Sequence, residues 1–304
     1  MIWLFLGHIL SSFGANYCAK MNSKTVSTKT GVSYAIVLLL NGLTACLFFS
    51  ISLKFRISFT PKTIVFSILY AAIVTGSLLT SLKLYQISTV SNVRLICSAA
   101  SMVLTSLLGW GIFQEEFYFK DLFRVFLMLC TSFFIFLNMK EREKTNALAS
   151  ERQGKKVSNL WLFCILVLGS IVFGCASTLI VKAYANATGV ADNNTWFFWT
   201  NVCLVLGNGV AVFLLKAKEK KRMKEVLSGF TCPQLLFMVG NTVCSNIDSL
   251  ICAALLARMM VSVYSPISSA IGVLCSVALS LAFKEKQGKW TWIAVVIALV
   301  AIFI

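Results

Sequence analysis

The chain has 304 residues, of which 58% are hydrophobic and 12% are charged, and its mean hydropathy is +0.85. A soluble globular domain carries roughly 25% charged residues, so this composition excludes a soluble fold. The net charge of +16 comes from Lys and Arg residues that cluster in the joints between apolar runs. That distribution is typical of membrane loops facing anionic lipid and argues against a basic face for nucleic acid.

Apolar runs of nearly bilayer-spanning length follow one another along the chain. A transmembrane helix needs about 20 apolar residues, with a range of ~17 to 25. These runs are continuously apolar rather than alternating, so they predict helices and not the strands of a membrane barrel. The ten predicted spans are 2–19, 34–53, 64–84, 94–113, 122–137, 160–183, 196–215, 235–256, 261–283 and 290–304.

The two halves of the chain carry short matches in the same order. Leu6-Gly7 recurs as Leu168-Gly169, Lys20 as Lys182, Asn41-Gly42 as Asn208-Gly209, and Phe113-Gln114-Glu115-Glu116 as Phe283-Lys284-Glu285-Lys286. We expect one five-helix repeat at 1–138, a charged linker loop at 139–158 and a second repeat at 159–304. Five is an odd number, so the copies would insert in opposite directions. The predicted fold class is an all-α membrane protein with ten transmembrane helices in two inverted five-helix repeats.

The ends of the fourth and ninth predicted helices carry a further pattern. Ser265-Pro266-Ile267 precedes Glu285, a polar turn and a final apolar run; Glu115 is followed by 122–137 in the first half, without the proline. This pattern resembles the drug/metabolite transporter superfamily, in particular its EamA-like members. The resemblance implies that helices 1 to 4 and 6 to 9 line a central cavity, with helices 5 and 10 outside. It also implies alternating-access transport of metabolites such as amino acids, sugar phosphates, nucleotide sugars or organic cations.

Polar residues at helical spacing mark two stripes that could face such a cavity. His8, Ser12, Asn16 and Lys20 lie four residues apart in the first helix, although helix packing through small and polar residues is the alternative. Asn241, Ser245 and Asp248 form a stripe in the eighth helix. An unpaired carboxylate at this depth costs about +2.5 to +3.5 kcal/mol, so we expect Asp248 either to face water, a partner or a substrate, or to be protonated.

Arg94 is the expected basic partner of Asp248, and a structural bridge and a cation or proton site are both open. The candidate solute contacts are His8, Ser12, Asn16, Asn41, Arg94, Thr178, Asn241, Ser245, Asp248 and Tyr264. The aromatic residues 196–199 favour an interfacial belt over substrate stacking. Glu115 and Glu285, at helix ends, favour a solvated or ion-paired role over catalysis.

The sequence does not assemble an enzyme, because the single histidine has no neighbouring nucleophile or carboxylate in the sequence. Metal-ligand spacing is also absent, the eleven cysteines are interpreted as apolar packing residues, and no cofactor is expected. We expect a multi-pass plasma-membrane exporter or exchanger of a small polar metabolite. A lipid-linked substrate flippase and a non-transporting membrane protein are the alternatives. Expected partners are the solute, membrane lipid and a second copy in a homodimer, without nucleic acid.

Overall fold

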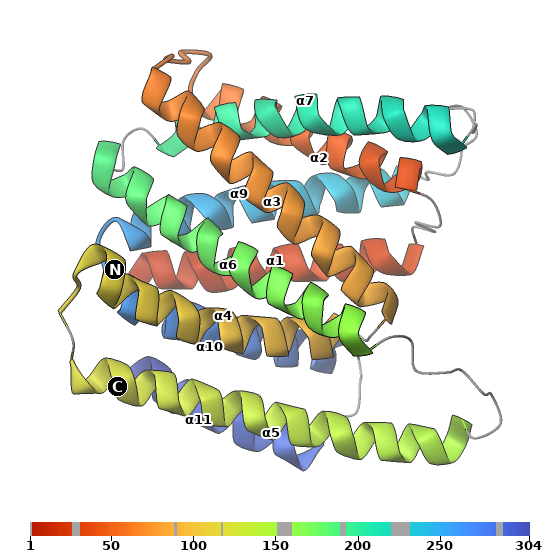
Figure 1. Ribbon diagram of the computed structural model, residues 1–304, viewed down its shortest axis with the longest axis vertical. Coiled ribbons are helices and arrows are strands. Elements are labelled where there is room, and N and C mark those ends of the chain that lie inside the picture. The colour runs from red at the N-terminus through yellow and green to blue at the C-terminus, as the bar shows by residue number, and fades with distance from the viewer. Residues whose placement is uncertain are drawn as a thin grey trace. The chain divides into compact units, whose positions relative to one another are not determined.

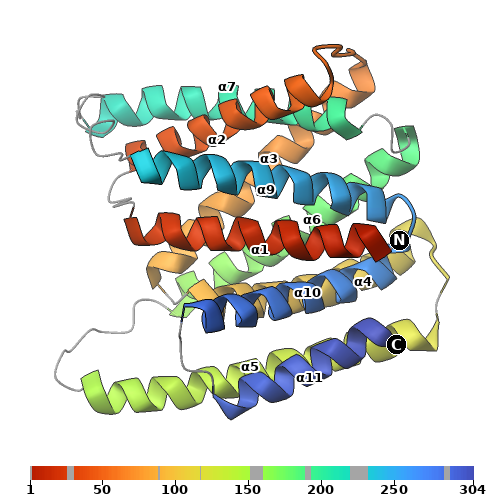
Figure 2. The same cartoon turned by 180° about the vertical axis from the view of Figure 1, so that it is seen from behind.

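The computed structural model describes residues 2–25, 31–87, 90–116, 118–150, 160–188, 193–219, 232–283 and 288–304. Among these residues every regular element is an α-helix (Figures 1 and 2), which confirms the all-helical part of the predicted fold class. The ten described helices are α1 (Ile2–Thr25), α2 (Gly31–Ser52), α3 (Pro61–Ile87), α4 (Val90–Phe113), α5 (Phe119–Ser150), α6 (Leu160–Thr188), α7 (Asn193–Glu219), α9 (Cys232–Leu256), α10 (Val261–Ala282) and α11 (Lys289–Phe303).

Each predicted span coincides with one of these helices, and the largest difference is at the end of α5. The apolar run predicts a helix over 122–137, followed by a linker loop that starts at 139. The structure continues α5 to Ser150, so residues 139–150 are helical, and the end of the expected linker lies outside the described residues. The polar segment from Lys140 to Lys144 consists of strong helix formers, and nothing in it requires the helix to stop where the apolar residues end.

Four helices in the described ranges are long and apolar enough to cross a membrane by length and composition. They are Cys164–Thr188, Asn193–Leu214, Cys232–Leu256 and Val261–Leu279. Each contains a strongly apolar stretch of 18 residues with at most two charged side chains. The chain is therefore compatible with a membrane protein.

The helices form two compact units, and each unit takes segments from both halves of the sequence. The first unit comprises Met1–Ala72 and Ala183–Ala257. In this unit α1 packs against α9, and α2 packs against α7 and α9, as the neighbouring ribbons in Figure 2 show. An aromatic cluster fills part of its interior, where the fully buried Trp196 stacks on Tyr184 with ring centroids 4.5 Å apart. Trp196 and Phe197 are thus interior residues of this unit, and the interfacial belt expected of residues 196–199 stays a prediction.

The second unit comprises Ile73–Lys182 and Arg258–Ile304. Within it α5 packs against α11 (Figure 1), while α10 packs against α4, α11 and α5. Met102, Met128 and Val273 occupy the core of this unit together with a stripe of alanines on α11, at positions 294, 298 and 301. Small residues at helical spacing let neighbouring helices approach closely, which is how membrane helices gain packing contacts. The proposed division into repeats stays a prediction.

Candidate functional site

Small residues on one face of α1 bring this helix close to α9. A Cβ atom on Gly7 would lie 2.9 Å from Ile251 Cδ1, and one on Gly14 would lie 3.0 Å from Cys244 Sγ. Gly7, Ser11 and Gly14 recur at spacings of four and three residues, so they share the face of α1 that meets α9. This close approach sets the polar residues of α1 within hydrogen-bonding distance of α9.

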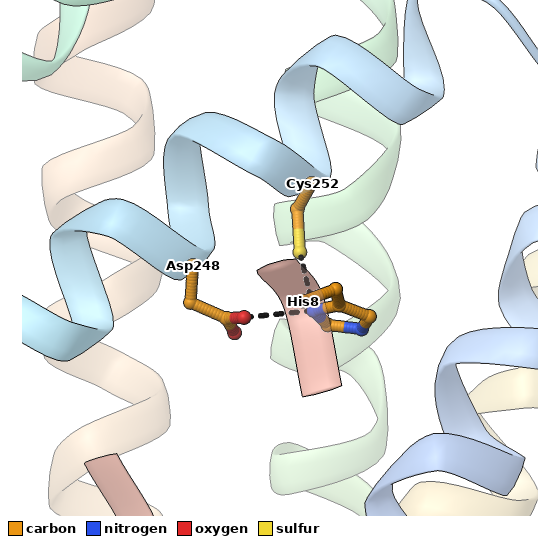
Figure 3. A group of neighbouring side chains, drawn as sticks. All are labelled: His8, Asp248 and Cys252. Carbon is orange, nitrogen blue, oxygen red and sulfur yellow. Dashed lines mark hydrogen bonds and ion pairs between the residues drawn. The ribbon is translucent and has the colours of Figure 1, made fainter. Parts of the chain in front are cut away.

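The closest polar contact between the two helices joins His8 to Asp248. His8 Nδ1 lies 2.7 Å from Asp248 Oδ1, and Figure 3 shows the two side chains pointing toward one another. The Ser12 hydroxyl donates to the same carboxylate oxygen at 3.0 Å. The Ser11 hydroxyl lies 2.6 Å from this oxygen and can donate to it or to the carbonyl oxygens of Gly7 at 2.8 Å and His8 at 3.2 Å. One carboxylate oxygen is therefore the meeting point of three potential donors.

Burial makes this cluster energetically significant. The His8 side chain is 5% exposed, whereas that of Asp248 keeps 23% of its surface. A carboxylate within an apolar helix is costly, and charge-assisted hydrogen bonds offset that cost. The protein therefore encloses the Asp248 side chain only in part.

Cys252 completes the cluster one turn after Asp248 on α9. Its Sγ atom lies 3.6 Å from His8 Nδ1 (Figure 3). One donor atom from each of His8, Asp248 and Cys252 lies within 4.8 Å of the others, so nitrogen, oxygen and sulfur ligands converge on one small region. Such a group of donors can hold a metal ion.

Of the remaining predicted residues in the first unit, Asn16 is nearest to the cluster along α1. Its amide nitrogen donates to the Ser12 carbonyl oxygen at 2.8 Å. Asn41 accepts a hydrogen bond from Thr242 of α9 at 3.0 Å, so it links α2 to α9. Asn241 and Ser245 are half-buried on α9, before Asp248. His8, Ser12 and Asp248 are the predicted residues that these contacts bring together.

Three predicted residues belong to the second unit. Thr178 of α6 donates to the Gly174 carbonyl oxygen at 3.4 Å, and Tyr264 of α10 is buried, with 6% of its surface exposed. Arg94 lies on α4, but its side chain is outside the described residues. The expected ion pair of Arg94 with Asp248 stays a prediction, and the basic partner that the structure gives Asp248 is His8.

A second polar cluster, in the second unit, holds the start of α10. The Glu115 carboxylate accepts hydrogen bonds from the Val261 backbone N–H at 2.6 Å and from the Ser262 N–H and hydroxyl at 3.0 and 2.9 Å. Lys182 donates to the Met259 carbonyl oxygen at 2.6 Å, just before the same helix. A carboxylate is favourable at a helix N-terminus because the first N–H groups lack partners within the helix. Glu115 thus caps the N-terminus of α10. The sequence favours a solvated or ion-paired role for this residue and does not predict the cap.

Sequence reasoning did not select Ser11, Cys252 or Thr242. Ser11 follows His8 by three residues and Cys252 follows Asp248 by four, so both positions extend the polar stripes that the helical period reveals. The sequence predicts packing roles for the cysteines because it places no histidine beside them. His8 and Cys252 are 244 positions apart, and the packing of α1 against α9 brings them together.

Comparison with known proteins leaves the family open but describes the fold. No protein-family model and no curated protein matches the sequence. A solved structure described only as "Crystal structure of protein" superposes with a TM-score of 0.66 at 11% sequence identity. The match covers 99% of this chain and 94% of that one. The likeness is one of fold alone.

Proposed function

We propose that the chain is a multi-pass transporter of the drug/metabolite transporter type, located in the plasma membrane. It exports or exchanges a small polar metabolite, such as an amino acid, by alternating access. The observation that carries the proposal is the His8–Asp248 pair, which sets two ionisable side chains on two largely apolar helices. Ionisable residues inside membrane helices are expensive, and they mark substrate, ion or proton pathways.

The packing of equivalent helices supports an inverted repeat of ten spans. In the predicted repeat α2 and α7 are the second helices of their halves, α4 and α10 the fourth, and α5 and α11 the fifth. In each of these pairs the two helices pack against one another. Two copies related by an internal two-fold axis bring equivalent elements together at that axis, so this pairing is expected for the proposed topology.

Matched glycines add a second argument for the repeat. Gly7 of α1 approaches Ile251 of α9, the third helix of the second half. Its sequence match, Gly169 of α6, approaches Thr80 of α3, the third helix of the first half, with 3.2 Å between a Cβ built on the glycine and Thr80 Cγ2. Gly7 and Gly169, which correspond in the two halves of the sequence, therefore each contact the third helix of the opposite half.

A solute can bind at this cluster by replacing one of the hydrogen-bond donors of Asp248. Asp248 Oδ1 is surrounded by His8, Ser11 and Ser12, and any of these donors can be replaced by an ammonium or hydroxyl group of a solute. Exchange of one donor for another keeps the partly buried carboxylate hydrogen-bonded throughout binding, which avoids the cost of leaving it unpaired.

The test is solute flux in proteoliposomes with a matched pair of α9 variants. A thermal-shift screen with amino acids, nucleotide sugars and organic cations selects the solutes. We expect Asp248→Asn to abolish or uncouple flux because the amide cannot supply the negative charge. Ser249→Ala is the control, since the Ser249 hydroxyl donates to the Ser245 carbonyl oxygen of its own helix at 2.9 Å.

Thermal unfolding and the yield of membrane-inserted protein show whether each variant is folded. A folded Asp248→Asn protein with wild-type flux would remove Asp248 from the transport site. Failure of every solute class in the panel to cross the vesicle membrane would count against transport itself.

A further inference from the structure

We propose that His8, Asp248 and Cys252 form a binding site for one divalent transition-metal ion of the zinc type. The three side chains offer one imidazole nitrogen, one carboxylate oxygen and one sulfur within 4.8 Å of each other. Asp248 and Cys252 are four residues apart on α9, which puts both on one face of the helix, and His8 meets them from α1 (Figure 3). Two ligands at this spacing on one helix are a recurring way to bind zinc.

The separations of the donor atoms suit a four-coordinate metal ion. With Zn–N near 2.05 Å and Zn–S near 2.3 Å, a tetrahedral angle places nitrogen and sulfur about 3.6 Å apart. His8 Nδ1 and Cys252 Sγ are 3.6 Å apart. The corresponding nitrogen–oxygen separation is about 3.4 Å, roughly 0.7 Å longer than the hydrogen-bonded distance. Asp248 must therefore move slightly away from His8 when it binds the metal ion.

Ligand chemistry and charge select the class of ion. Hard cations such as Mg²⁺ and Ca²⁺ prefer oxygen ligands, whereas imidazole and thiolate favour zinc and its transition-metal neighbours. A neutral imidazole, a carboxylate and a thiolate together carry two negative charges when they bind a metal. A dication neutralises them, which matters in a buried site where an uncompensated charge is costly.

The surroundings of the cluster resemble the outer shell of a metal site. Ser11 and Ser12 lie 2.6 and 3.0 Å from Asp248 Oδ1, so their hydroxyls can orient the carboxylate. Three protein ligands leave a fourth coordination position for water or a solute group, unlike the closed four-ligand sites that only stabilise a fold. The proposed site is thus suited to an exchangeable ion.

The experiment measures binding of Co²⁺ and Zn²⁺ alone to the full-length protein in detergent, under reducing conditions and with a histidine-free affinity tag. Co²⁺ bound to a thiolate gives a sulfur-to-metal charge-transfer band in the near ultraviolet. We expect one equivalent of Co²⁺ to produce this band and Zn²⁺ to displace it. Removal of an outer-shell partner typically weakens metal binding ~10- to 100-fold, so loss of a ligand should weaken it by at least about 100-fold.

Matched cysteine variants assign the band. Cys252→Ser should lose it, whereas Cys244→Ser, two turns earlier on α9, should keep both the band and the wild-type affinity. His8→Gln should also bind at least about 100-fold more weakly, and His8 is the only histidine in the chain. Absence of saturable Co²⁺ binding by the wild type would overturn the proposal. So would a band that survives Cys252→Ser or disappears with Cys244→Ser; Cys252→Ala replaces the serine variant if the latter does not fold.

Metal binding is an equilibrium measurement, so its outcome is separate from that of the proposed transport. Binding without flux of any solute or ion supports the metal site and counts against the transporter. Flux that depends on Asp248, without metal binding, supports the transporter and overturns the metal site.

Discussion

Replacement of Glu115 tests whether a single carboxylate holds the start of α10. Glu115→Ala removes the acceptor for two backbone N–H groups, those of Val261 and Ser262. Each unsatisfied buried donor costs about 1–3 kcal/mol. Because Glu115 is half-buried and water can reach part of the vacated space, we expect the lower part of that range, a total loss of about 2–3 kcal/mol.

The neighbouring glutamate supplies the control. Glu116 is exposed, and its carboxylate accepts a hydrogen bond from the exposed Tyr118 hydroxyl. Surface substitutions of this kind usually change stability by less than about 0.5 kcal/mol. Glu115→Gln should fall between the two alanine variants, because the amide keeps one oxygen acceptor but loses the charge that favours a helix N-terminus.

Thermal unfolding in detergent measures the difference. At about 2–4 °C per kcal/mol, Glu115→Ala should lower Tm by roughly 4–12 °C, and Glu116→Ala by about 2 °C or less. Equal Tm values for the two alanine variants would refute the assignment of Glu115 as the cap of α10.

Two further predictions concern packing and a buried ion pair. A Cβ atom on Gly42 would lie 2.8 Å from Val205 Cγ2, so Gly42→Ala should lower stability by about 1–3 kcal/mol. Gly207→Ala, with no atom within 4 Å of its Cβ, should gain up to about 1 kcal/mol; the opposite order in thermal scans would contradict the close approach of α2 and α7. Asp121 pairs with Arg124 at 2.7 Å, so Asp121→Ala should cost about 3–5 kcal/mol by leaving a cation unpaired. The double alanine variant should be more stable than that single variant, and a less stable double variant would disprove this account.

Helix positions were predictable because apolar runs of nearly bilayer-spanning length mark them in the sequence. The predicted span 261–283 agrees with α10, which ends at Ala282, and 94–113 agrees with α4, which starts at Val90. Hydropathy locates the hydrocarbon boundary of a run, not the last hydrogen bond of its helix. For that reason α5 extends to Ser150, well beyond its apolar residues.

The sequence identifies the two polar stripes of the candidate site but not the contact between them. The helical period identifies the stripes of α1 and α9 separately, and the cost of a carboxylate in an apolar helix identifies Asp248 as a residue that needs a partner. The choice of His8 as that partner depends on which helices pack together, and local sequence does not carry this information. The cap on α10 has the same origin, because Glu115 and Val261 are separated by 146 residues.

The distance along the chain between His8 and Asp248 also bears on biosynthesis. Ribosomes add roughly 5–20 residues each second, so the 240 residues between them take on the order of 10–50 s to synthesise. In the proposed membrane topology, α1 enters the bilayer during that interval without the carboxylate that its histidine contacts in the finished protein. Nascent chains truncated before α9 should therefore retain α1 in the membrane less firmly than the full-length chain does.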